Sequence, residues 1–494
     1  LMGVGTLQRA YTGREVVLES ELKDIPPKER AGLLVKPDNM WSLKGLKFIL
    51  TGYIPVEEWI DPFIAYAGFV FLLLMATFSL NVIMRRQWVD NERYPLPLLK
   101  IPQILIGGQD EDTSTDPGPL SSVWKNRIMW AGYAVTLFWC LMRLWHAYNP
   151  KVPDMEINVP LKPYFADPGW GNMWNNVSFH VVGAFLAVAV FMELNVLLSL
   201  VLGYFLYRLQ FWFGKSTGLD IYPEFPFGLY QEVAAFAAYG LVVLFFTRKY
   251  LWRVLKDAAK GNKEAWQGES ISYRTALAVL VAVPILLVAW ARWTDMGVGG
   301  VLAFFGFMVM IGFVCAKFRA ECGTPFSHYG PIRPFLFLSL IGGMYALGAD
   351  VIAFSVIMSF ILSQTVFFVL PGIQIELMEI GRRYRMKPRH VLYTVLIGMA
   401  GGFLVGGWVF LSTAYALGGE NMTHQWAFAD KGFLFRHYNV ELMQATQKFL
   451  STQTETAAEA STQGATQPYI WACVFAAVVT VAVSVLRQLF AGFW

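Results

Sequence analysis

The sequence predicts an all-α polytopic membrane protein, a bundle of membrane-spanning helices. Hydrophobic residues make up 56% of the 494-residue chain and charged residues only 15%, whereas soluble domains carry about 25% charged residues. Apolar runs recur along the chain and are separated by charged or proline-containing segments. Because about 20 apolar residues take a helix across the hydrocarbon core, the lipid bilayer is the first partner that the sequence predicts.

The apolar runs divide the chain into three regions. Residues 1–58 are mixed and charged, so we expect an extramembrane connecting segment. Residues 59–330 form a membrane domain, and residues 331–494 form a C-terminal membrane domain with an extracytoplasmic loop at 418–467. The chain begins with Leu1 and ends in an apolar segment, so we expect a longer protein with further spans outside these residues.

Apolar runs of helical length predict the membrane helices. They lie at 62–84, 128–145, 228–246, 275–293, 298–316, 333–348, 351–370, 391–413 and 469–486. The corner after the first run, from Arg86 to Arg93, is closed by prolines that stop a helix. We expect this corner to be a structural clamp at the inner surface, with Trp88 in the aromatic belt of the membrane interface.

One further run, at 177–213, is too long for a single span and holds Glu193 and Asn195 in its middle. A carboxylate at bilayer depth costs about 2.5 kcal/mol or more unless it is paired, protonated or in contact with water. The run is therefore either one long tilted helix or a re-entrant hairpin that turns at residues 193–195.

The positive-inside rule decides between these two structures. Arg85 and Arg86 close the first span and place its end in the cytoplasm. Lysines and arginines crowd the segment 248–274, which places that loop inside as well. The span at 228–246 must therefore run from outside to inside, so the run at 177–213 has to begin and end outside.

A re-entrant hairpin at about 177–213, with Glu193 at its tip, satisfies this alternation. It also places the later basic segments inside, including the one at 382–389. Arg208 and Lys215 count against the hairpin, because they would lie on the outer side.

Two segments carry a distinctive pattern. The first runs from Leu80 to Pro97 and contains Arg85-Arg86-Gln87-Trp88-Val89-Asp90, and the second is Arg319-Ala320-Glu321-Cys322-Gly323-Thr324-Pro325-Phe326. They resemble the patterns LRRQWVExERLxFPL and RAEAGLPW of a family of uncharacterised bacterial multi-pass membrane proteins. Further matches are Arg127, Ser272-Tyr273-Arg274 and the basic corner at 380–391.

The resemblance covers most of 40–415, and it implies a multi-pass protein of the bacterial inner (cytoplasmic) membrane. The family is similar, at the level of architecture, to oligopeptide-transporter (OPT) proteins, which move peptides or metal chelates and are usually driven by protons. It therefore implies an OPT-like bundle. The chain departs from the family at Met192-Glu193, where members often have proline before aspartate, and at the divergent segment 418–467.

Glu193 and Asn195 are the first candidates for a substrate or proton pathway. Broken helix ends within a membrane expose backbone groups that bind ions and solutes, and a carboxylate at that depth can take up and release a proton. The alternative is structural, with Glu193 paired to a cation such as Arg143 or lying near the surface.

Arg319, Glu321 and Gln364 complete the predicted pathway. Arg319 and Glu321 are two residues apart and would not face each other on a helix. They form either a gate beside the helix end at Cys322 or a cytoplasmic anchor. Gln364 either contacts substrate or bonds across helices, and Asp350 is expected to be a solvated acid at an outer turn.

These observations predict a secondary, proton- or ion-coupled transporter of a small solute such as a peptide. The alternative is a non-transporting membrane scaffold or an accessory subunit of a larger complex, and a second copy of the chain is a further candidate partner. No acid–base or metal-ligand spacing is visible, so we expect no enzyme activity, no metal site and no cofactor. The charge distribution offers no nucleic-acid surface.

Overall fold

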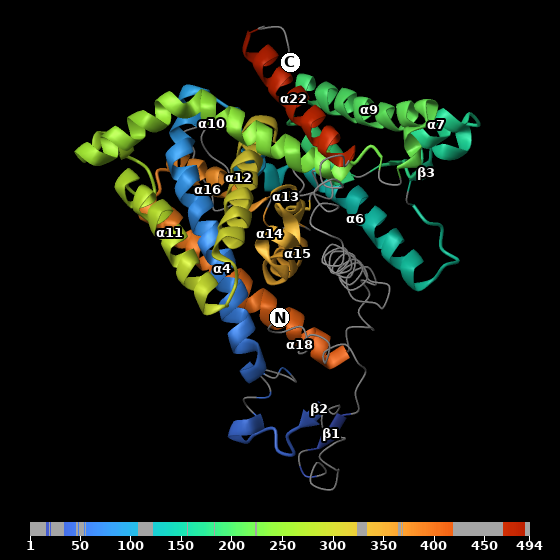
Figure 1. Ribbon diagram of the computed structural model, residues 1–494. Coiled ribbons are helices and arrows are strands. Elements are labelled where there is room, and N and C mark those ends of the chain that lie inside the picture. Colours follow the sequence, from blue (N-terminus) through green and yellow to red (C-terminus); the bar gives the residue numbers. More distant parts are fainter. Residues whose placement is uncertain are drawn as a thin grey trace.

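The computed structural model of the protein is a helix bundle built around α4 (Val56–Arg85) and α12 (Val298–Cys322), with a small pair of strands at one end (Figure 1). Within the described residues, eight helices are long and apolar enough to cross a membrane. The predicted all-α polytopic bundle is therefore confirmed. The structure describes residues 16–18, 20, 34–45, 48, 54, 56–106, 122–155, 157–181, 183–222, 225–323, 333–363, 367, 369–417 and 468–489.

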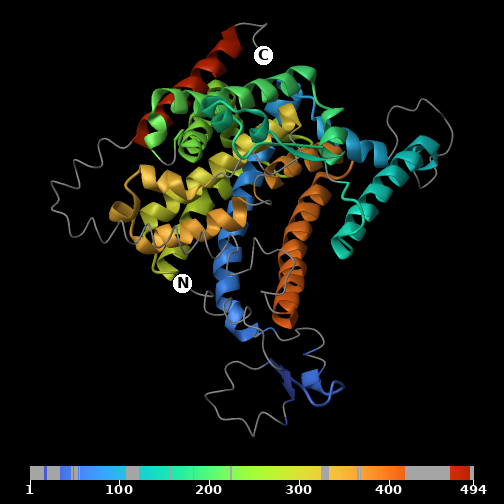
Figure 2. The same cartoon turned by 90° about the vertical axis from the view of Figure 1, so that its right-hand side faces the viewer.

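The other long apolar helices continue the bundle. They are α6 (Arg127–Tyr148), α9 (Leu194–Thr217), α10 (Gly228–Lys260), α11 (Tyr273–Trp293), the continuous stretch of α17 (Pro388–Gly401), η8 (Gly402–Gly406) and α18 (Gly407–Leu417), and α22 (Pro468–Leu489). Figure 2 shows α6 standing apart from the bundle, and the window of α6 that would cross the membrane has no buried residue.

Shorter elements connect these helices. The strands are β1 (Val16–Leu18), β2 (Leu34–Lys36), β3 (Asn158–Pro160) and β4 (Ser178–His180), with β1 parallel to β2 and β3 antiparallel to β4. The short α-helices are α5 (Lys100–Ile106), α7 (Pro168–Met173), α8 (Gly183–Ala189), α13 (Phe335–Leu340), α14 (Gly343–Leu347), α15 (Ala349–Ser363) and α16 (Leu370–Arg383). Single turns are η2 (Arg86–Asn91), η3 (Pro97–Leu99), η4 (Ser122–Lys125), η5 (Lys162–Tyr164), η6 (Leu219–Ile221) and η7 (Glu264–Trp266).

Aromatic rings fill the centre of the bundle where α4, α11, α12 and α15 meet. The ring of Phe69 lies 5.5 Å from Trp290, 5.5 Å from Phe305 and 5.1 Å from Phe354. The indole nitrogen of Trp290 also donates to the carbonyl of Ala65, at 3.0 Å. Because lipid tails are as apolar as these side chains, close packing and interhelical hydrogen bonds hold the helices together.

Gly312 lets α4 and α12 approach closely. A Cβ atom added at this position would lie 2.9 Å from the Phe367 ring and 2.9 Å from the Thr77 methyl group. Small residues serve this purpose at helix interfaces in membranes. Gly306, on the exposed face of the same helix, has no atom within 4 Å of such a Cβ.

The N-terminal end of the C-terminal membrane domain differs from the prediction. The run at 333–348 forms two short helices, α13 and α14, separated by Ile341 and Gly342; the φ angles of Gly342 (123°) and of Gly343 (57°), the first residue of α14, are left-handed and interrupt a helix. The run at 351–370 is not one span either, because Phe367 and Val369 lie in turns before α16 begins at Leu370-Pro371. Proline is tolerated at that position because a residue in the first turn of a helix has no intrahelical acceptor for its backbone N–H, the group that proline lacks.

Helix α10 is longer than predicted and crosses the bundle obliquely. Its early turns pack on α13, and Phe236 contacts Phe318 of α12 with ring centroids 6.2 Å apart. Further along, the Tyr250 hydroxyl donates to the Ile83 carbonyl of α4 at 2.8 Å. The basic residues after Phe246 continue the helix to Lys260, because long cationic side chains can extend from an apolar helix toward water.

The run at 177–213 breaks where it was predicted to. Helix α8 ends at Ala189, a turn follows, and Glu193 precedes α9 in an extended conformation. One continuous tilted helix is therefore excluded. The two limbs are unequal, because α8 has 7 residues whereas α9 has 24 and is long enough to cross a bilayer by itself. The re-entrant course of this run through the membrane stays a prediction.

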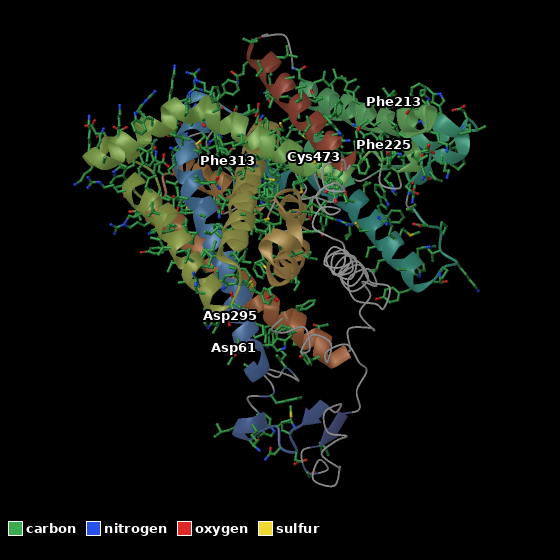
Figure 3. The ribbon with its side chains drawn as sticks, in the orientation of Figure 1. Asp61, Phe213, Phe225, Asp295, Phe313 and Cys473 are labelled. Atoms are coloured by element: carbon green, nitrogen blue, oxygen red, sulfur yellow. The ribbon has the colours of Figure 1, made fainter. Side chains whose placement is uncertain are left out.

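The basic segments gather at one end of the bundle, which we call the inner end after the predicted topology. The Arg86 side chain at the end of α4 donates to Ala265, and Arg274 donates to Ala258. Asp61 and Asp295 lie at the opposite end (Figure 3). The cations that counted against the topology have local partners: Arg208 donates to the Met173 and Asn175 carbonyls, and Lys215 pairs with Asp220.

Replacing Gly312 by leucine should destabilise the protein by about 1–3 kcal/mol, because the added side chain overpacks the contact of α12 with α4. Thermal unfolding in detergent measures the loss. Gly306→Leu, with the same change in helix propensity, should unfold close to the wild-type temperature. Equal losses in both variants would contradict the close approach at Gly312.

Cysteine labelling tests the course of the run at 177–213. In a chain without its native cysteines, His180→Cys and Ser216→Cys should both react with an impermeant maleimide added outside intact cells. Lys263→Cys, in the basic connection after α10, should react only after permeabilisation. Labelling of residues 180 and 216 from opposite sides would refute the hairpin topology.

Candidate functional site

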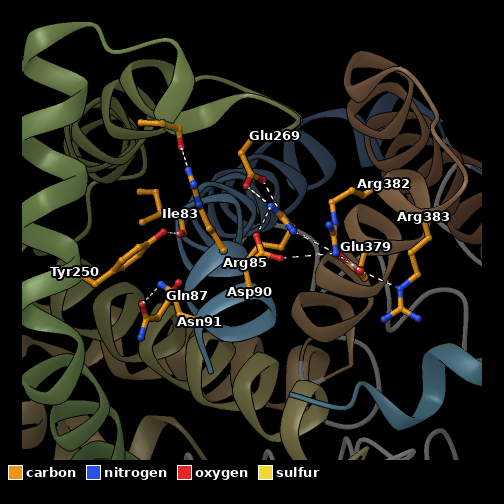
Figure 4. Close-up of polar contacts among 12 residues, drawn as sticks. Ile83, Arg85, Gln87, Asp90, Asn91, Tyr250, Glu269, Glu379, Arg382 and Arg383 are labelled. Carbon is orange, nitrogen blue, oxygen red and sulfur yellow. Dashed lines mark hydrogen bonds and ion pairs between the residues drawn. The ribbon is translucent and has the colours of Figure 1, made fainter. Parts of the chain in front are cut away.

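A cluster of ion pairs closes the inner end of α4. Arg85 is 3% exposed, and its guanidinium meets Glu269 with Nε–Oε2 at 2.8 Å (Figure 4). The same guanidinium lies 3.4 Å from Glu379 and 3.5 Å from Asp90. A buried guanidinium needs such partners because desolvation costs several kcal/mol per ion in a protein interior. The cluster thereby ties α4 to α16 and to the connection between α10 and α11.

Glu379 balances the charge of this cluster. Its carboxylate is buried and accepts from Arg382 at 2.8 Å and from Arg383 at 2.9 Å, one turn later on α16. The cluster thus contains three guanidiniums, those of Arg85 and the two α16 arginines. It contains three carboxylates, those of Asp90, Glu269 and Glu379. The cluster is therefore close to neutral, which suits a clamp between helices better than a site for a charged solute.

Trp88 belongs to this clamp rather than to the interface belt. Its side chain is fully buried, and its ring centroid lies 5.3 Å from that of Phe313. The expectation of a belt residue was wrong, because η2 continues α4 after Arg85 and turns this indole inward.

A second ion pair joins α12 to α16. Arg319 binds Glu376 through two parallel hydrogen bonds, Nε–Oε1 at 2.8 Å and Nη2–Oε2 at 2.9 Å. The Arg319 side chain passes directly over Gly372, where any larger residue would collide with it. Two parallel bonds between a guanidinium and a carboxylate combine charge with a fixed geometry.

A third group of ion pairs joins α12 to α22. Glu321 accepts from Lys317 at 2.5 Å and also from Arg487. The Lys317 ammonium lies 4.8 Å from the ring centroid of Tyr94 and 5.7 Å from that of Tyr239. Burial raises the pKa of Tyr94 well above its ordinary value, so its hydroxyl stays neutral beside the ammonium.

Between these pairs and the centre of the bundle lies a buried polar contact at the start of α16. Asn81 of α4 donates to the Pro371 carbonyl at 2.7 Å and to the Gln374 side chain at 2.9 Å. Gln374 in turn donates to the Leu74 carbonyl at 3.4 Å. Leu74 precedes Arg85 by eleven residues, or about 16 Å along the helix. The contact is therefore well inside the bundle.

This contact lies beside non-helical backbone that precedes α16. Phe367 and Val369 lie in turns, and α16 begins at Leu370, next to the Pro371 carbonyl that accepts from Asn81. We call these turns the gap between α15 and α16. Among the described atoms, the hydroxyl of Ser79 and the amide oxygen of Asn81 are buried without a hydrogen-bond partner. Polar groups of this kind and a helix terminus can together bind a small polar solute.

A comparison with protein families now places the chain. A model described as "Family of unknown function (DUF6785)" matches residues 38–494. The chain belongs to this family. The match extends through the segment at 418–467 that was expected to diverge. No curated protein and no solved structure matches the chain.

Two of the predicted pathway residues of this family member, Glu193 and Asn195, are exposed at the start of α9. Arg319 and Glu321 have different partners, as their spacing predicted. Gln364 lies outside the described residues.

Sequence reasoning missed several residues of the site. Asn81, Gln374 and Glu376 were not singled out, and neither was Glu232, a carboxylate in the fifth position of α10. The sequence could have indicated these residues, because each is polar and lies inside or beside an apolar run. In a membrane segment such a residue usually pairs with another polar group or has a function. Asp350, by contrast, is exposed in the first turn of α15, as expected for a solvated acid.

Replacing Glu376 by leucine should lower the free energy of unfolding by about 3–5 kcal/mol, because Arg319 is then left buried without its carboxylate. Thermal unfolding in detergent measures the effect. The double variant Arg319→Met/Glu376→Leu should regain most of the loss. Lys215→Met, which breaks the exposed pair with Asp220, should cost no more than about 1 kcal/mol. A double variant as unstable as the single one would contradict this account.

Proposed function

We propose that the protein is a secondary transporter of a small polar solute, driven by a proton or ion gradient. The observation that carries the proposal is the gap between α15 and α16 beside the buried Asn81–Gln374 contact. Irregular backbone at membrane depth is tolerated only where protein or a water-filled cavity covers it. Transporters use such interrupted helices to bind solutes near the midplane.

The groups at the gap indicate the class of solute. Side-chain amides of Asn81 and Gln374 offer both donors and acceptors, and the first turn of α16 presents the positive end of a helix dipole. A neutral or zwitterionic solute with amide and carboxylate groups, such as a short peptide, fits this set. Gln364, which stands in the sequence between α15 and α16, remains a proposed member of the site.

The ion pairs at the inner end fit an inner gate. Arg319–Glu376 follows Gln374 within one turn of α16, and Glu321 holds α12 to α22 through Lys317 and Arg487. Access from the inner side requires these pairs to exchange partners while the helices move. Glu193 and Asn195, exposed at the start of α9, remain proposed members of the pathway.

The distant architectural resemblance to oligopeptide-transporter proteins supports the same proposal by analogy. In that case the protein is placed in the bacterial inner membrane, with its basic end in the cytoplasm.

Transport of short peptides by the reconstituted protein tests the proposal. Vesicles with an imposed proton gradient should accumulate labelled dialanine or trialanine above protein-free vesicles. Gln374→Leu removes amide contacts at the gap and should lower uptake about tenfold, the equivalent of 1.4 kcal/mol. Gln267→Leu, an exposed residue of the α10–α11 connection, should transport like the wild type.

Two results would overturn the proposal: no accumulation of either peptide by the wild-type protein, or full uptake by Gln374→Leu. A scaffold or accessory subunit would then be the remaining candidate. The exposed helix α6 favours that second function, because its membrane-crossing window has no buried residue and is free to contact another protein.

A further inference from the structure

Glu232 is a carboxylate inside the membrane domain that forms no hydrogen bond or ion pair with the described part of the chain. It lies in the early part of α10 and is partly buried. Across the described residues it makes no hydrogen bond and no ion pair, in contrast to the paired carboxylates of the inner end. An ionised carboxylate inside a membrane domain raises the free energy of the folded protein. Packing alone therefore gives no reason for a carboxylate at this position.

The neighbours of Glu232 establish its depth. Its carboxylate acts electrostatically on the Cys315 thiol of α12 and on the Tyr207 hydroxyl of α9. Cys315 precedes Cys322 by seven residues, or about 10 Å, and follows Val298 by seventeen residues, or about 26 Å. Cys315 is fully buried. Glu232 therefore lies beside the interior of α12 rather than at either end of it.

The titratable groups near this region come from several elements. Helix α9 contributes Tyr207, α12 contributes Cys315, and α22 contributes Tyr469 and Cys473 beside Tyr230. Helix α13, which also packs on α10, has no titratable residue in Phe335–Leu340, but Arg333 lies two residues before it with a buried Nε. Arg208, the neighbour of Tyr207 in the sequence, directs its guanidinium to the Met173 and Asn175 carbonyls. Because no described cation forms an ion pair with Glu232, a proton is one means of neutralising it.

A cavity lies next to the same turn of α10. It has a volume of about 510 Å³ and is lined by residues of α9, α10 and α22, among them Gln210, Gln231 and Trp471. Gln231 is adjacent to Glu232 in the sequence and bonds to Gln210 at 2.7 Å. This amide pair is a polar edge on an otherwise apolar cavity, one residue before Glu232 on α10.

We propose that Glu232 is the proton-binding site that couples the gradient to solute movement; the coupling role rests on the proposed transporter function. The Glu232 carboxylate takes up one proton when it is open to one side of the membrane. It stays neutral while the protein changes conformation, and it then releases the same proton to the other side. Because α10 packs on α12 and α22, which the Lys317–Glu321–Arg487 pairs hold together, rearrangement of these pairs can change the access of water to Glu232.

Infrared difference spectra test proton binding without any transport measurement. The wild-type protein in lipid nanodiscs should show the carbonyl band of a protonated carboxylic acid that disappears as pH is raised. Glu232→Gln should lack this band, whereas Glu264→Gln, an exposed residue outside the spans, should keep it. An unchanged band in Glu232→Gln would overturn the proposal.

Transport measurements test coupling. Glu232→Gln should lose accumulation of labelled dialanine driven by a proton gradient, at least tenfold, while exchange of internal for external dialanine without a gradient continues. Accumulation at the wild-type rate in Glu232→Gln would overturn the proposal. If the wild-type protein moves no peptide but the infrared band depends on Glu232, the transporter function fails and the proton site stands. Folding of each variant is checked by its elution as a single species in detergent.

Discussion

The need to pair buried charge organises the inner half of this protein. Arg85 sits at the end of the central helix α4 and is almost fully removed from solvent, so it requires carboxylates around it. Those carboxylates come from η2, from the α10–α11 connection and from α16, which are far apart in the sequence. A single guanidinium thus specifies how three parts of the chain converge. The Arg319–Glu376 pair and the pairs of Glu321 extend the same constraint to α12 and α22.

The outer part of the bundle follows a different principle. There the helices meet through aromatic rings around Phe69 and through close approach at Gly312. Contacts of this kind are numerous and individually weak, whereas the inner ion pairs are few and depend on geometry. A bundle that is apolar at one end and ion-paired at the other can move its inner helices by exchanging pairs while the outer contacts persist. This asymmetry is the physical basis of the proposed inner gate.

Between the two ends lie the features that packing alone does not explain. Phe367 and Val369 lie in turns just before α16, inside the membrane domain, where irregular backbone needs protein or water to cover it. The Asn81 amide donates to the Pro371 carbonyl in the first turn of α16. Glu232 adds an acid that forms no ion pair with a described residue. Each feature is costly in a membrane, and together they are the reason for proposing a solute site and a proton site in this region.

The sequence by itself determined the class of the protein and most of its spans, and it predicted that the basic segments lie together. These follow from composition, from the length of apolar runs and from counting charges, all of which are local properties. The break before Glu193 was also predictable, because a run of that length with an acid in it does not fit one helix. Membership in the family is likewise a property of the sequence.

Only the tertiary structure decided which residues act together. The spacing of Arg319 and Glu321 predicted that they do not face each other, but it did not reveal their partners on other helices, Glu376 and Arg487. Trp88 was expected at the interface and is buried, because η2 turns it inward. The division of 333–370 into short helices depends on glycine conformations and on packing that hydrophobicity does not report. Glu232 became notable through the groups that surround it. The partners of these side chains come from segments far apart in the sequence, and no local pattern in the sequence shows which distant segments will meet.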